Sequence, residues 1–146
     1  MLNIENSTTL KFDHIILENI SLDLTSRDID ITICYNPTIQ HYNALYRGKN
    51  SPTDVLSFPL DDEFINSEFN HIPLGSIMIS ADYVTKVSTE LNHSCSDELS
   101  LLFIHGLLHL LGYDHEIDNG EMRKKEEELI KKFSLPKSLI IRMEKH

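Results

Sequence analysis

Four short stretches of the chain have the pattern of β-strands. The clearest covers residues 28–35, where polar residues alternate with isoleucines, as they do in a strand with one buried face. Shorter stretches of the same kind occupy residues 2–4, 55–60 and 74–79. Pro59 has no backbone N–H, so we expect the third strand to end there or to lie at the edge of a sheet. The acidic stretch at residues 61–71 is predicted to be a polar excursion between two strands.

Longer stretches with apolar residues at helical spacing predict helices between and after these strands. They cover residues 12–24, 36–48, 80–91, 99–111 and 120–133, and a short terminal helix is expected after Pro136. We expect Asn36 to cap the second helix, with Pro37 at its first position and Gly48 at its end. Residues 94–97 resemble a capping box ahead of the fourth helix, and Glu/Lys pairs four residues apart lie along the fifth.

Length and composition indicate an ordinary globular protein. A chain of 146 residues is long enough for one compact domain, which we expect to cover residues 1–146. The apolar runs fall short of the roughly 18 residues of a membrane span, and the N-terminal residues lack the pattern of a secretory signal. We therefore expect a cytoplasmic protein that does not bind membranes. Cys34 and Cys95 form no CxxC pair, so Cys34 is predicted to be a core thiol.

The charge is negative overall and unevenly distributed. A formal net charge of -10 excludes nucleic-acid binding through a wholly basic surface. Between Asp28 and Thr85 the sequence contains no lysine or arginine except Arg47 and Lys49. Any anion-binding region in this part of the chain must therefore be small and local.

Three histidines lie in or next to the most apolar of the predicted helices. His105 and His109 are four residues apart and therefore lie on one face of the helix, one turn apart. Gly112 is suited to end the helix in a left-handed conformation, and the resulting turn would bring His115 toward the other two. Three imidazoles with a fourth position left open suit a catalytic Zn²⁺ ion, which acidifies its bound water. Ni²⁺ or Co²⁺ would accept the same ligands.

A structural role is the alternative for each of these residues. A single histidine on an apolar helix is more often a core residue with satisfied hydrogen bonds. Burying three histidines would leave six ring nitrogens in need of hydrogen-bond partners. Each nitrogen without a partner would cost roughly 1–3 kcal/mol of stability. Gly106 adds weight to a specialised role, because glycine inside a helix costs about 1 kcal/mol relative to alanine and often marks a close approach.

The spacing of residues 105–115 matches the metzincin pattern H-E-x-x-H-x-x-G-x-x-H at the three histidines and at Gly112. Gly106 stands where that pattern has the glutamate that acts as general base. A peptidase would therefore need another carboxylate. Asp114 and Glu116 are near in sequence, but hydrogen bonding to a histidine or plain exposure to solvent explains them equally well.

With these residues in view, the chain resembles the YbeY family of bacterial metal-dependent, single-strand-specific endoribonucleases. The family signature H-G-x-L-H-L-x-G-Y-D-H is met at residues 105–115, and a second family block resembles residues 43–59. Residues 122–128 resemble its C-terminal helix. Ser76 and Asn50 stand where the family commonly has aspartates, so roles of those carboxylates do not carry over.

The resemblance implies a mixed α/β fold of the α+β class. A small, mostly parallel four-stranded sheet would be flanked by five or six helices, one of them a metzincin-like zinc helix. It also implies one Zn²⁺ ion held by His105, His109 and His115, and a functional Arg47. The implied activity is zinc-dependent cleavage of single-stranded RNA in ribosomal RNA maturation, at the 3′ end of the small-subunit RNA, and in ribosome quality control. The implied partners are ribosomal RNA, ribosomal proteins and a ribosome-associated GTPase.

Physical reasoning supports a role for Arg47 independently, because a guanidinium group binds phosphate through two hydrogen bonds. An ion pair with one of the many carboxylates is the alternative. Lys49 and Tyr46 are candidate substrate contacts, Tyr46 by stacking on an unpaired base. A core role is the alternative for Tyr46. The sequence leaves two attacking groups open, a water activated by the metal ion and the 2′-OH of the RNA.

Two other functions remain compatible with the residues. One is a metallopeptidase-like hydrolase, whose peptide cleavage would survive Arg47→Ala. The other is a ribosome assembly factor without catalytic activity, in which a metal ion stabilises the helix end and Arg47 binds RNA or protein. The negative net charge favours the second of these mildly, because a free ribonuclease usually has a more basic surface.

Overall fold

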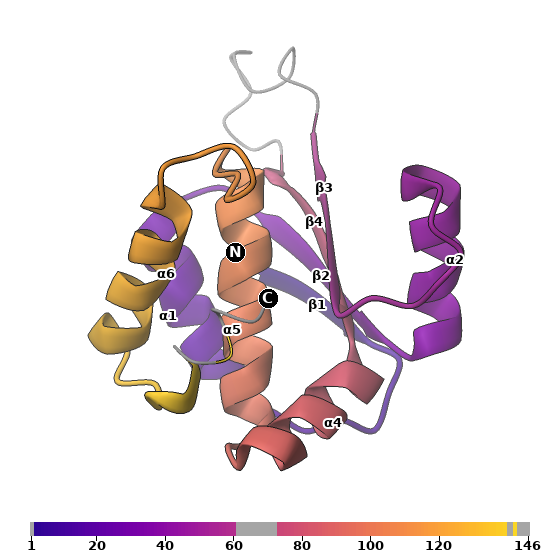
Figure 1. The fold of residues 1–146 in the computed structure, drawn as a ribbon, viewed down its shortest axis with the longest axis horizontal. Helices are drawn as coiled ribbons and strands as arrows, with labels where there is room; N and C mark the ends of the chain where they lie inside the picture. The colour runs from indigo at the N-terminus through magenta and orange to yellow at the C-terminus, as the bar shows by residue number, and fades with distance from the viewer. Residues whose placement is uncertain (1, 61–72, 140–141, 143–146) are drawn as a thin grey trace.

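The computed structural model describes residues 2–60, 73–139 and 142. In chain order these residues form β1 (Leu2–Asn6), α1 (His14–Leu24), β2 (Ile29–Cys34), α2 (Asn36–Arg47), β3 (Val55–Pro59), β4 (Gly75–Ser80), α4 (Ala81–Leu91), α5 (Cys95–Leu110) and α6 (Glu121–Lys132) (Figure 1). The predicted α+β class is confirmed, because the described residues contain four strands and five helices. The predicted excursion at residues 61–71 lies outside the described residues. No helix within the described ranges has the length and apolar character needed to cross a membrane.

The sheet has the strand order β1-β2-β4-β3. Strand β2 pairs in parallel with β1 and with β4, whereas β3 pairs antiparallel with β4. The sheet is therefore mostly parallel, as predicted. Pro59 ends β3 opposite Gly75, at the edge of the sheet where a missing N–H is tolerated.

The two faces of the sheet carry different helices. Ile31, Ile33 and Ile77 lie in the main hydrophobic core with residues of α1, α5 and α6. On the other face, Cys34 and Met78 pack against α2 in a smaller cluster. Figure 1 shows α2 across the strands from α1, α5 and α6. The predicted core position of Cys34 is confirmed, because this residue is 1% exposed.

Helix boundaries follow the sequence signals with one correction. Gly48 ends α2 in the left-handed conformation, at φ 68°, as predicted. The prediction that Asn36 caps α2, with Pro37 at the first helical position, is wrong, because Tyr35 is the cap, Asn36 is the first helical residue and Pro37 is the second. The Asn36 amide oxygen instead accepts a hydrogen bond from Ser80 Oγ at 2.7 Å, which ties the start of α2 to the end of β4.

The C-terminal part of the chain packs on α5 and α1. On α6 the predicted pair Glu127–Lys131 forms at 3.0 Å, whereas Lys132 pairs with Asp23 of α1. After Pro136 the described residues include helical positions at Leu139 and Arg142.

Candidate metal centre and its cleft

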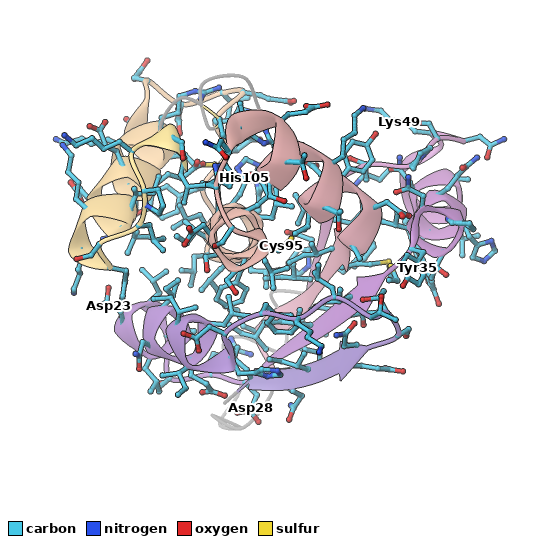
Figure 2. The ribbon with its side chains drawn as sticks, turned by 90° about the horizontal axis from the view of Figure 1, so that it is seen from below. Asp23, Asp28, Tyr35, Lys49, Cys95 and His105 are labelled. Carbon is cyan, nitrogen blue, oxygen red and sulfur yellow. The ribbon has the colours of Figure 1, made fainter. Side chains whose placement is uncertain are left out.

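Helix α5 carries the first two histidines through the middle of the molecule. Ser94 caps it by accepting a hydrogen bond from the Asp97 N–H at 3.0 Å, as the capping pattern predicted. Helix α5 is buried on almost every side, by strands on one side and by α1, α4 and α6 on the others. This burial explains why the helix lacks a polar face. Figure 2 shows His105 on this helix, inside the ring of surrounding elements.

A tight turn after α5 brings the third histidine back. The Tyr113 N–H donates to the Leu108 carbonyl at 3.0 Å, and the Gly112 N–H donates to the His109 carbonyl at 3.1 Å. These two bonds form a Schellman motif, which needs a left-handed residue at Gly112, where φ is 100°. The prediction that Gly112 ends the helix in this conformation is confirmed.

The three histidines meet at one point. One ring nitrogen from each of His105, His109 and His115 lies within 4.8 Å of the other two. The Nε2 atoms of His105 and His109 are 3.1 Å apart. Two nitrogens bound to one tetrahedral zinc at 2.0–2.1 Å lie roughly 3.3 Å apart, so the observed spacing suits such an ion.

Hydrogen bonds on the outer side of two rings fix their tautomers. His109 Nδ1 is 3.0 Å from the Tyr113 carbonyl oxygen, which only accepts, so this nitrogen donates. His105 Nδ1 is 3.1 Å from Glu126 Oε1 and donates to that carboxylate. In the neutral rings both Nε2 atoms then carry lone pairs that point at the same place.

This donor set fits a divalent cation. Two lone pairs that face each other at 3.1 Å repel unless a proton or a cation lies between them. His115 Nδ1 is buried and has no hydrogen-bond partner among the described residues. His105, His109 and His115 could together hold one metal ion, and a carboxylate–histidine pair of the Glu126–His105 type is typical of such sites.

The electrostatic environment also favours neutral imidazole. Burial lowers the pKa of His109, and the neighbouring His105 lowers it further, while the bond to the Tyr113 carbonyl works in the opposite direction. A neutral ring is the form that binds metal. The site is therefore prepared to bind a cation at neutral pH.

The histidines open into a cleft of about 990 Å³. Arg47 and Lys49, from the end of α2 and the segment after it, line the same cleft. In Figure 2, Lys49 and His105 lie toward the same side of the molecule, away from Asp28. The two isolated cations of the sequence thus share a cleft with the histidines, whereas Tyr46 is 63% exposed and stacks on Tyr42 with ring centroids 6.1 Å apart.

Ser57 of β3 connects Arg47 to the histidine helix. Its Oγ donates to the Gly106 carbonyl at 3.0 Å, and its own carbonyl accepts from Arg47 Nη2 at 3.4 Å. A Cβ at position 106 would lie 2.9 Å from Ile77 Cγ2 and 3.1 Å from Ser57 Oγ. Gly106 therefore lets α5 lie directly on the sheet, and this position has no room for the glutamate of a peptidase.

Sequence reasoning missed two residues of this site. It placed Glu126 only within a family-like helix and gave it no role, although its 3% exposure and its bond to His105 make it part of the site. Ser57 was also missed, and no local signal marks its two contacts. Asp114, considered as a partner for a histidine, instead accepts from the Glu116 N–H within the turn.

This chain is similar to known proteins in sequence and in fold. The family model described as "Endoribonuclease YbeY" matches residues 4–134. A Sulfurovum sp. protein named Endoribonuclease YbeY is 54% identical to this chain, and the alignment covers 97% of each chain. A Helicobacter pylori protein of the same name is 48% identical to it, with 97% of this chain and 98% of the relative covered. A solution structure of a Thermotoga maritima protein superimposes with a TM-score of 0.59 at 26% identity, covering 91% of this chain and 89% of the other.

Proposed function

The chain belongs to the YbeY endoribonuclease family, and on that premise we propose that it is a metal-dependent endoribonuclease that cleaves single-stranded RNA. The single domain would span residues 1–146. The observation that carries the proposal is the convergence of three histidines in one cleft with Arg47.

His105, His109 and His115 are proposed as the metal ligands. Zinc is the proposed metal because three neutral imidazoles match its preferred donors, and Ni²⁺ and Co²⁺ would fit as well. A bound ion of this kind supplies a Lewis acid that acidifies water and polarises a phosphoryl oxygen. Glu126 would orient the His105 ring, and the Tyr113 carbonyl would orient the His109 ring.

Arg47 is the proposed catalytic residue. Its guanidinium group lines the cleft and is held by the Ser57 carbonyl, which leaves other N–H groups to bind a phosphate. There it would stabilise the negative charge that develops on the phosphoryl group. Lys49 is proposed to contact a neighbouring phosphate. Tyr46, which is 63% exposed and forms an edge contact with Phe58 at 5.4 Å, is proposed to stack on an unpaired base.

Ribosomal RNA is the proposed substrate, with a role in maturing the 3′ end of the small-subunit RNA and in ribosome quality control in the cytoplasm. The negative net charge supports delivery of that RNA by a partner, because little of the cleft attracts RNA by itself. A ribosomal protein or a ribosome-associated GTPase would serve as this partner.

The test is to load the purified protein with zinc and offer single-stranded RNA, duplex RNA and a peptide pool. We expect cleavage of the single strand, and its loss in folded His109→Ala. Arg47→Ala should lower the cleavage rate by roughly 10²–10³, the usual effect of removing one group that stabilises a transition state. Lys86→Ala, at an exposed position of α4, is the control for loss of one positive charge.

The rival functions give different results. Peptide cleavage that survives Arg47→Ala would identify a peptidase-like hydrolase. RNA binding without turnover would identify an assembly factor. RNA cleavage that persists in the folded His109→Ala variant would contradict the metal-dependent mechanism.

A further inference from the structure

A buried network of ionisable side chains lies beside the histidine site and takes no part in the mechanism above. His93 Nε2 is 2.9 Å from Glu98 Oε1, and Arg142 Nε donates to Glu98 Oε2 at 3.1 Å. Arg142 Nη2 also donates to Asp54 Oδ2 at 2.9 Å. The side chains of Glu98 and Arg142 are 0% and 10% exposed. The guanidinium group of Arg142 thus joins two carboxylates from distant parts of the chain.

Asp54 is the member of this network that reaches the cleft machinery. It precedes β3 directly, and its Oδ1 accepts from the Val55 N–H at 2.8 Å. Its main-chain carbonyl accepts from the Ser80 N–H at 2.9 Å. One carboxylate oxygen therefore fixes the first residue of β3 while the other is held by Arg142. Both Asp54 and Arg142 line the cleft.

Strand β3 connects Asp54 to the residues of the histidine site. Among the described residues it pairs with β4 alone, so fewer backbone hydrogen bonds hold it than hold a central strand. Ser57 lies two residues after Val55 and contacts both Arg47 and Gly106. A shift at the start of β3 would move the carbonyl that holds the Arg47 guanidinium relative to the histidines on α5.

We propose that Arg142 is a positioning residue: by holding Asp54 it fixes the start of β3, and through Ser57 it sets where Arg47 lies relative to the three histidines. For its effect on cleavage the proposal rests on the function proposed above. The contact with Glu98 anchors Arg142, and the contact with Asp54 performs the positioning.

Arginine is suited to this task and lysine is not. The two contacts come from different nitrogens of one planar group, Nε and Nη2, which a single ammonium cannot reproduce. Arg142→Lys keeps a positive charge beside the buried Glu98 carboxylate, so the variant should fold. It should lose the second contact, to Asp54.

The experiment compares Arg142→Lys with Lys132→Ala, which breaks an ion pair between α6 and α1 that does not touch β3. Cleavage of single-stranded RNA is measured in the wild-type background and in the Arg47→Ala background. In the wild-type background we expect Arg142→Lys to lower kcat/KM roughly tenfold. This is less than the roughly 10²-fold loss that a 1 Å misplacement of a catalytic group can cause. In the Arg47→Ala background the same change should have almost no effect, because Arg142 acts through Arg47.

Two measurements separate positioning from a general loss of structure. The visible spectrum of the Co²⁺-loaded protein reports the histidine site and should be unchanged in Arg142→Lys. The NMR resonances of the Ser57 amide and the Arg47 Nε–H should shift in Arg142→Lys and stay in place in Lys132→Ala. If Arg142→Lys does not fold, Asp54→Asn replaces it, because that variant leaves Arg142 on Glu98 and keeps an acceptor for the Val55 N–H.

An equal loss of cleavage in both backgrounds, or unchanged resonances of Ser57 and Arg47, would overturn the proposal and make Arg142 a structural anchor only. If the wild-type protein does not cleave RNA, the proposed function fails. The resonances then decide the positioning by themselves.

Discussion

Glu126 is the residue whose single contact tells most about the candidate metal centre. Its carboxylate accepts from His105 Nδ1, and its side chain is almost fully buried. We expect Glu126→Gln to weaken zinc binding by roughly 10–100-fold, because the amide is a poorer acceptor and orients the ring less firmly. Competition with a chelating dye measures this affinity.

Glu127→Gln is the matched control, since it removes the same charge from the next position, where the side chain pairs with Lys131 on the surface. Equal affinities in the two variants would contradict a role for Glu126 at the site.

Cys34 provides a second test at the level of one residue. Burial, and then the nearby charge of Asp82, raise the pKa of its thiol to about 11. At pH 8 only about one thiol in a thousand is then ionised, and the thiolate is the reactive form. We expect Cys34 to resist iodoacetamide in the folded Cys95→Ala variant and to react after unfolding in urea, as mass spectrometry would show. Equally fast labelling of the folded and unfolded forms would disprove this assignment.

At the scale of elements, the contact of α5 with the sheet depends on Gly106. Alanine there would gain about 1 kcal/mol of helix propensity. Its Cβ would press on Ile77 Cγ2 at 2.9 Å, and overpacking of this kind costs about 1–3 kcal/mol. We expect a net loss of stability of up to about 2 kcal/mol in Gly106→Ala, measured by urea unfolding.

A double-mutant cycle supplies the control for this prediction. Ile77→Ala removes the carbon atom that would be contacted, so the double variant should be less destabilised than the sum of the two single variants. Additive losses would mean that Gly106 matters for another reason.

At the scale of the whole molecule, the net charge of -10 limits how RNA can bind. Arg47 and Lys49 line the cleft, whereas Arg142 there is already held by two carboxylates. With about two phosphates neutralised, the logarithm of the affinity for single-stranded RNA should fall with the logarithm of salt concentration at a slope of roughly -1.4. Fluorescence anisotropy at several salt concentrations measures it.

Arg47→Ala should reduce the slope to roughly -0.7, while Lys86→Ala, outside the cleft, should leave it unchanged. A much steeper slope in the unmodified protein would show that RNA binds over a broad basic surface, with the lysines of α6 as its most evident source.

The sequence by itself determined the local features of this protein. Strand β2, the cap at Ser94 and the turn at Gly112 were predictable because each depends on residues a few positions apart. The same holds for His105 and His109, whose spacing of four residues aligns them on any α-helix. Arg47 was predictable as a candidate because it is one of few cations in an acidic region.

Tertiary structure decided every contact between residues far apart in the chain. Glu126 reaches His105 across 21 residues, and Arg142 reaches Asp54 across 88. No periodicity or spacing encodes such pairs, because they depend on how α6 packs against α5 and on where Arg142 lies relative to α5 and β3. Gly106 illustrates both kinds of information. The sequence predicted a close contact there, because glycine is unfavourable inside a helix, and only the packing of α5 on the sheet showed that the contacting residues are Ile77 and Ser57.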